Sequence, residues 1–149
     1  MSPTVGLIVT TVVVLVLFHF LDWLFWGTSW TQRHVFAHMP KEMFRLPDDP
    51  AKQKEAGKRA VLLGALVTTL AAVVFVPLVW LLGPRFAGAR VLVLAVLLSA
   101  AFVLPSALYE GIYYRVPKQM VWLQWWAGFA RVLVGLIATT WLLTTFNAW

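Results

Sequence analysis

The sequence predicts an all-α integral membrane protein that folds as a bundle of four transmembrane helices. The chain has 149 residues, of which 61% are hydrophobic and 12% are charged. Soluble domains average about 45–50% apolar and about 25% charged residues, so this chain has too few polar side chains to cover a water-soluble globule. The same composition excludes disorder. The absence of cysteine excludes disulfide frameworks and thiolate metal sites.

Four apolar segments account for most of the chain, and they run over about 5–26, 60–82, 91–109 and 121–143. Each is close to the roughly 20 residues that a helix needs to cross about 30 Å of hydrocarbon. We interpret the first segment as a retained span because no basic residue precedes it and its apolar run is longer than that of a signal peptide. The links between the last three segments are short, so residues 1–149 form a single transmembrane domain of antiparallel neighbours.

The basic residues lie mostly on one side of these spans. The loop 27–58 with the start of the second span, and the link before the fourth span, lie on one side and carry Arg33, Lys41, Arg45, Lys52, Lys54, Lys58, Arg59, Arg115 and Lys118. The link between the second and third spans lies on the other side and carries Arg85 and Arg90. Cytoplasmic loops are enriched in Lys and Arg. We therefore expect a cytoplasmic basic loop, both termini on the non-cytoplasmic side, and a location in the bacterial cytoplasmic (inner) membrane.

The basic loop has local structure of its own. Asp49-Pro50 is a helix start, since Asp is a good cap and Pro lacks an N–H that would be unpaired at the first position. The second span is therefore expected to begin as a helical extension near Pro50. Residues 31–39 form either a short interfacial helix or a solvated loop. Because the Lys residues alternate with acidic ones beside a membrane, we expect the lipid bilayer as partner and no nucleic acid.

Ionisable residues inside the spans are costly and need an explanation. The spans hold His19, Asp22, Glu110 and Arg131, and helical rise places all four in the cytoplasmic half of the membrane. His19 and Asp22 are three residues apart and share a helix face. We expect Arg131 to pair with Glu110, Asp22 or both. This layer is interpreted as a buried ion pair that fixes helix register, with a ligand-binding or proton-handling site as the alternatives.

Small residues predict where the helices approach each other closely. One stripe in the fourth span consists of Gly128, Arg131, Gly135 and Ala138, and a matching stripe in the second span consists of Ala60, Gly64, Thr68 and Ala71. The Arg131 stripe predicts that this side chain points into the bundle. Pro105 predicts a distortion of the third span, since it frees a backbone carbonyl one turn earlier.

A polar aromatic pocket is expected at the cytoplasmic ends of the helices. Its expected lining residues are Tyr109, Tyr113, Tyr114 and Trp125. We predict no resident cofactor and no metal site, because His34 and His38 lack a third ligand at a suitable spacing. An axial contact of His19 with haem or a chlorophyll-type pigment remains an alternative.

Several short motifs resemble those of an uncharacterised bacterial family of small four-helix inner-membrane proteins, a domain of unknown function. The residues that carry the resemblance are Trp23, Phe25-Trp26-Gly27, Trp30, Tyr109-Glu110-Gly111, Gly128, Gly135 and Trp141. They are spread over most of the chain. The resemblance implies a four-helix membrane fold and no particular activity. The long basic loop and Arg131 are departures from it.

No catalytic motif is present: the sequence has no phosphate-binding glycine loop, nucleophile elbow or paired-histidine zinc motif, and we name no catalytic residue. We therefore favour a non-enzymatic role, as a structural or accessory subunit of a larger membrane complex or a self-associating protein. The alternative is a lipid-, quinone- or pigment-binding membrane protein that uses the polar pocket. A membrane enzyme or proton-coupled carrier is the third hypothesis.

Overall fold

The computed structural model of the chain describes residues 2–34, 37, 49–84, 89–105, 107–108 and 118–149, and within these residues it contains helices and short connections but no strand. The elements are α1 (Pro3–Asp22), η1 (Trp23–Gly27), α2 (Ser29–His34), α3 (Pro50–Leu82), α4 (Ala89–Leu98), η5 (Ser99–Val103) and α6 (Lys118–Thr145). η1 and η5 are π-helical turns that continue α1 and α4. The predicted all-α class is confirmed.

Three stretches are long and apolar enough to cross a membrane, as expected of an integral membrane protein. They are Pro3–His34, Lys54–Leu82 and Lys118–Thr145. The expected span 91–109 contributes a shorter apolar helix in the described part of the chain, Arg90–Val103. Its expected end at residue 109 lies outside the described residues.

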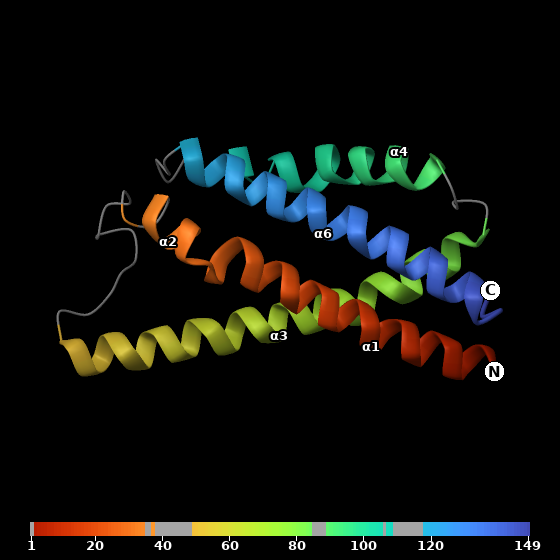
Figure 1. The fold of residues 1–149 in the computed structure, drawn as a ribbon, viewed down its shortest axis with the longest axis horizontal. Coiled ribbons are helices and arrows are strands. Elements are labelled where there is room, and N and C mark those ends of the chain that lie inside the picture. The colour runs from red at the N-terminus through yellow and green to blue at the C-terminus, as the bar shows by residue number, and fades with distance from the viewer. Residues whose placement is uncertain (1, 35–36, 38–48, 85–88, 106, 109–117) are drawn as a thin grey trace.

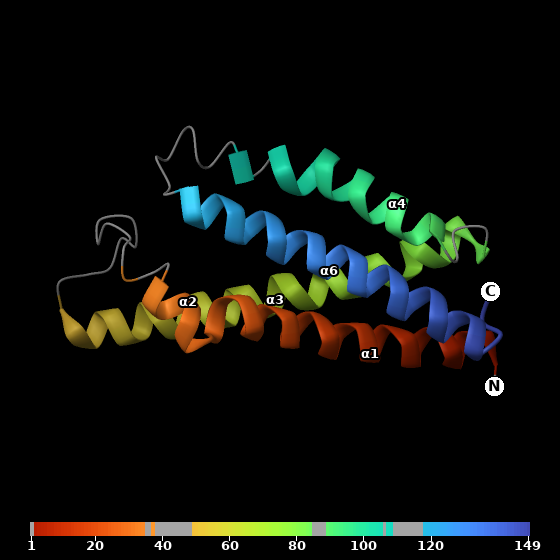
Figure 2. The same ribbon diagram turned by 45° about the horizontal axis from the view of Figure 1, so that its top comes forward.

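The helices lie nearly side by side, and both chain termini are at the same end of the molecule (Figure 1). α6 lies between α4 on one side and the pair α1 and α3 on the other in both views (Figure 2). It packs against all three of these helices, whereas α3 packs mainly against α1. α6 is therefore the central helix of the fold.

Capping fixes the start of α3, as the sequence predicts, and the end of α6. Asp49 caps α3, because its Oδ1 accepts a hydrogen bond of 2.8 Å from the Ala51 amide, and Pro50 follows at the first helical position. α6 ends in a Schellman turn, in which Asn147 has a positive φ of 49° and the Ala148 amide donates to the Leu143 carbonyl at 2.9 Å. The indole N–H of Trp80 then donates to the Ala148 carbonyl at 2.7 Å, which ties the chain end to α3.

Close packing around α6 follows the small-residue stripe that the sequence indicates. A Cβ atom at Gly135 would lie 2.8 Å from the Phe18 ring of α1 and 2.9 Å from the Phe75 ring of α3. The two rings meet edge to face at 5.5 Å between centroids. A Cβ atom at Gly128 would lie 2.3 Å from Val103 of η5. The two glycines thus admit three neighbouring elements to the surface of α6.

The matching stripe predicted on the second span is only half correct. Thr68 is buried, and Ala71 packs against the core formed by Val14, Phe18, Ala72 and Val76. In contrast, Ala60 and Gly64 are exposed, and a Cβ atom at Gly64 would meet nothing within 4 Å. The reason is geometric: α3 has 33 residues, and its first turns diverge from α1 toward the end opposite the termini (Figure 1).

Pro105 produces the expected distortion in a specific form. The five residues Ser99–Val103 form a π-helical turn, whose capping Leu104 amide bonds to the Ser99 carbonyl. A proline ring in a regular helix collides with the carbonyl four residues earlier, here Ala101. Widening the turn relieves that collision. Because Val103 belongs to this turn, the widened segment is the part of the chain that packs on Gly128.

Candidate functional site

The polar centre of the molecule is an ion pair between α6 and α1. The Arg131 guanidinium bonds to the carboxylate of Asp22, the last residue of α1. Arg131 lies about 20 Å along α6 from Lys118, near the middle of a span. The side chains of Arg131 and Asp22 are 28% and 25% exposed, so about three quarters of the surface of each side chain is buried. Pairing lowers the cost of burying either charge alone, which is about 2.5–3.5 kcal/mol at a helix centre.

Two adjacent threonines of α3 complete this layer. Thr68, which is 3% exposed, donates its hydroxyl to the second carboxylate oxygen of Asp22. Thr69 lies 3.3 Å from Nε2 of His19, and its own hydroxyl donates to the Ala65 carbonyl at 2.8 Å. A hydroxyl has one proton, so we assign the His19 contact as an N–H donation from Nε2 to Thr69. The pair Thr68-Thr69 therefore binds both polar residues on the shared face of α1.

Thr68 departs from the behaviour of other threonines in the spans. Thr10, Thr11, Thr140 and Thr144 each donate to the carbonyl four residues earlier in their own helix, at 2.7–2.9 Å. This back-bonding removes the cost of a hydroxyl in an apolar environment. Thr68 instead uses its proton on a carboxylate of another helix. The layer thus links three helices, α1, α3 and α6.

The Phe18 ring of α1 also contacts Arg131. Its guanidinium carbon lies 5.8 Å from the centre of the Phe18 ring, within the range of a cation–π contact. Phe18 is itself fixed against Gly135, one turn along α6. The Nε atom of Arg131 is buried without a hydrogen-bond partner. The guanidinium is therefore bound at its Asp22 end and retains donor capacity at Nε.

Next to the ion pair, the end of the first span is distorted. η1 occupies the turn directly after Asp22, and π-helical turns leave backbone carbonyls without their usual partners. Side chains of α2 take up these carbonyls: Thr31 donates to the Phe25 carbonyl at 2.6 Å and Gln32 donates to the Trp26 carbonyl at 3.4 Å. These two bonds therefore tie α2 to the end of η1.

A cleft of about 800 Å³ opens between this distorted segment and the first half of α3. Its deep end, nearest the core, holds the polar layer. The residues lining it are His19, Asp22, Trp23, Trp26, Gly27, Gln32, Val61, Leu63, Gly64, Ala65, Val67, Thr68 and Arg131. Its size falls in the range of small-molecule sites, about 300–1,000 Å³. We take this cleft as the candidate functional site.

The structure brings together three of the four residues of the sequence-predicted layer. His19, Asp22 and Arg131 all line the cleft. Glu110, the other expected partner of Arg131, lies outside the described residues, as do Tyr109, Tyr113 and Tyr114.

Trp125 is described but does not line the cleft. Its ring lies 4.6 Å from that of Trp126 and 6.0 Å from that of Phe129, between centroids, in an aromatic cluster on α6.

Sequence reasoning missed the contribution of α3 and α2 to this site. Thr68 was assigned only a packing role, and Thr69 and Gln32 were not singled out. Trp23 and Trp26 entered only among the residues that carry the family resemblance. A usable indication was present: two adjacent hydroxyls stand in an otherwise apolar segment, opposite an intramembrane carboxylate.

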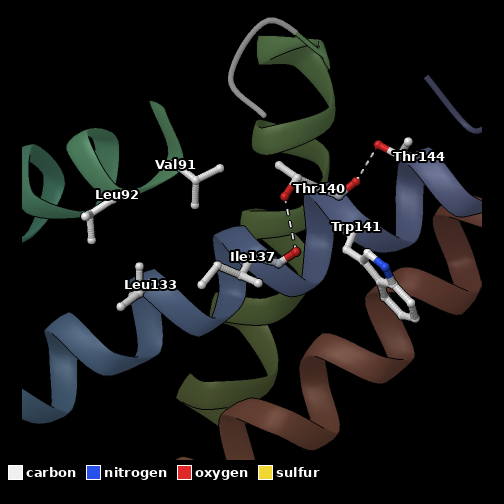
Figure 3. Close-up of a pocket in the computed structure, with 7 residues that line it drawn as sticks. All are labelled: Val91, Leu92, Leu133, Ile137, Thr140, Trp141 and Thr144. Atoms are coloured by element: carbon white, nitrogen blue, oxygen red, sulfur yellow. Dashed lines mark hydrogen bonds between the residues drawn. The ribbon is translucent and has the colours of Figure 1, made fainter. Parts of the chain in front are cut away.

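A second groove lies between α4 and α6, nearer the termini, and the described residues that line it include no charged one. It encloses about 550 Å³ and is lined by Val91, Leu92, Leu133, Ile137, Thr140, Trp141 and Thr144. Its hydroxyls are occupied, because Thr140 also bonds to the Ile137 carbonyl at 3.1 Å and Thr144 bonds to the Thr140 carbonyl (Figure 3). This groove offers a ligand apolar contact but few free polar groups, so we rank it below the cleft as a candidate site.

Comparison with protein-family models, with curated proteins and with solved structures yields no match to this chain.

The ion pair predicts a thermodynamic cycle. Arg131→Leu leaves Asp22 without its counter-charge and should lower the free energy of unfolding by about 3 kcal/mol, the low end of the range for buried pairs because a quarter of each side chain is exposed. The double variant Asp22→Leu, Arg131→Leu should recover much of that loss. Thermal stability in detergent measures both. A single Arg131→Leu variant as stable as the unsubstituted protein would show that the pair does not stabilise the fold.

Proposed function

We propose that this protein is a four-span membrane protein that binds a small amphiphilic molecule in the cleft beside the Asp22–Arg131 pair. The observation that carries the proposal is the cleft itself, which has apolar walls and a polar deep end. Ligand sites commonly combine a largely apolar lining with a few fixed polar groups. The expected alternative role as a lipid-, quinone- or pigment-binding protein is thereby the one that the geometry favours.

The arrangement of the helices supports four membrane crossings. α4 and η5 lie alongside α6 (Figure 2), and the chain enters α4 at the end where the termini lie (Figure 1). Four crossings with both termini together place the starts of α3 and α6 on the opposite side. The basic residues on that side then favour the cytoplasm, by the positive-inside rule. A bacterial cytoplasmic membrane is the location we propose.

Within this topology, a ligand would enter from the lipid. The lining of the cleft lies on membrane-spanning segments, and its α3 wall carries Val61, Leu63 and Val67. These apolar side chains suit a hydrocarbon tail, and the polar layer suits a head group. A pigment bound axially through His19 would have to use Nδ1 or break the contact of Nε2 with Thr69, so we favour a lipid or a quinone over a pigment.

A second role is favoured by the exposed first half of α3. Every residue from Ala60 to Gly64 is exposed, around a full helical turn. Two of them are small residues four apart, a spacing that lets a partner helix approach closely. This surface supports the expectation of a structural or accessory subunit in a larger membrane complex. Purification in mild detergent should then yield a defined complex with another membrane protein or a second copy, and a lone monomer would count against this role.

The proposed topology predicts a labelling pattern. The chain contains no cysteine, so single cysteines introduced for Ser2, Lys52 and Asn147 can be labelled individually. A membrane-impermeant maleimide added to intact spheroplasts should label positions 2 and 147, and it should label position 52 only after permeabilisation. Labelling of position 52 in intact cells would reverse the orientation. Labelling of positions 2 and 147 from opposite sides would exclude an even number of crossings.

Blocking the cleft predicts loss of ligand binding without loss of the fold. Gly64→Leu should fill the cleft, because the glycine lines it and a Cβ atom there meets nothing within 4 Å. Gly57→Leu is the matched control: it also enters open space on α3, but outside the cleft. At both positions leucine is a better helix former than glycine, by at most about 0.8–1.0 kcal/mol.

The measurement is calorimetry in nanodiscs with a total membrane lipid extract added. We expect a saturable rise in Tm for the unsubstituted protein and for Gly57→Leu, but not for Gly64→Leu, because a bound ligand stabilises only the folded state. Equal responses of all three proteins would refute ligand binding in the cleft.

A further inference from the structure

The charge of the cleft limits the ligands that it can accept. Among the described residues that line it, Arg131 is the one permanent cation and Asp22 the one carboxylate, and they neutralise each other. A charged head group placed beside this pair would lack a counter-charge in an apolar environment. Burial of an unpaired charge is strongly unfavourable. The deep end of the cleft therefore selects against net-charged molecules.

The hydrogen-bonding groups of the cleft are unequal in kind. Both carboxylate oxygens of Asp22 are occupied, one by Arg131 and the other by Thr68. The guanidinium carries five N–H donors and no acceptor, and the indole of Trp23 is likewise a donor only. The Nε atom of Arg131 is enclosed by protein atoms, so the guanidinium meets a ligand through its terminal N–H groups. With both carboxylate oxygens occupied, the Asp22–Arg131 pair offers a ligand only N–H donors, which favours a head group that carries acceptor oxygens.

The size and lining of the cleft set the rest of the ligand. The α3 wall is apolar at Val61, Leu63 and Val67, and Gly64 between them contributes no side chain. A hydrocarbon tail can therefore lie directly against the backbone of α3. The Trp23 and Trp26 rings on the opposite wall add flat apolar surface.

From these three observations we infer that the ligand is an uncharged amphiphile whose head group carries carbonyl oxygens and whose tail is hydrocarbon. This inference rests on the proposed function and names the chemical class that the cleft selects. Two membrane components have this chemistry, an isoprenoid quinone and a neutral glycerolipid such as diacylglycerol. Anionic phospholipids are excluded from the deep end, although the basic loop lies on the same side of the spans.

The test uses the full chain in phosphatidylcholine nanodiscs and three probes added separately: decylubiquinone, dioleoylglycerol and phosphatidylglycerol. Calorimetry measures Tm for the unsubstituted protein, Gly64→Leu and Gly57→Leu. A probe at 100 times its Kd should raise Tm by about 6 °C in a chain of this length. We expect that rise from decylubiquinone or dioleoylglycerol, in the unsubstituted protein and in Gly57→Leu, and its absence in Gly64→Leu. Whichever neutral probe acts identifies the source.

The inference is overturned if phosphatidylglycerol alone raises Tm in a manner that Gly64→Leu abolishes. In that case ligand binding in the cleft stands and only the chemical class is wrong. It is also overturned if neither neutral probe acts. The response to the total lipid extract then separates the two failures: a response that depends on Gly64 preserves the proposed function, and its absence removes both.

Discussion

The cost of placing Asp22 and Arg131 in an apolar environment is the constraint on which the rest of the structure depends. A charge alone at a helix centre costs about 2.5–3.5 kcal/mol. Each residue can satisfy the other only if α6 and α1 approach within contact distance at that level. Thr68 adds α3 to the same point, since its hydroxyl binds the remaining carboxylate oxygen. One polar layer therefore sets the register of three helices relative to each other. Apolar contacts between helices set register only weakly in a membrane, because lipid tails are as apolar as the side chains.

Close packing on the core side of this layer is what allows the pair to form. Phe18 lies one turn before Asp22 and contacts the α6 surface at Gly135, one turn after Arg131. A larger residue at Gly135 would push the two helices apart, because the Phe18 ring is 2% exposed and has no free space to move into. The same ring lies under the guanidinium at 5.8 Å. Packing and electrostatics therefore act on the same helix–helix distance.

The sequence predicted the elements well and the site in part, for physical reasons. Long apolar runs, the Asp49-Pro50 cap and the Pro105 distortion depend on local chemistry, so they are readable without the fold. The pairing of Arg131 with one of two carboxylates followed from the scarcity of charges in the spans. The roles of Thr68 and Thr69 were not readable, because threonines in spans mostly bond to their own helix. The divergence of α3 was not readable either, since a small-residue stripe does not say which of its turns has a neighbour.

The cleft is a consequence of the same layer. Toward the core, Val14, Phe18, Ala72 and Val76 hold α1 and α3 together. Toward the other end, the helix after Asp22 changes to the wider η1, while α3 continues as a regular helix. α3 diverges from the first span at this end (Figure 1), and Gly64 supplies no side chain to fill the space. The polar groups that link the helices, Asp22, Arg131 and Thr68, thus line the deep end of the cleft. Removing the ion pair would change stability and the site together. Filling the cleft at Gly64 leaves the ion pair and the core contacts in place, and for that reason Gly64 separates binding from folding.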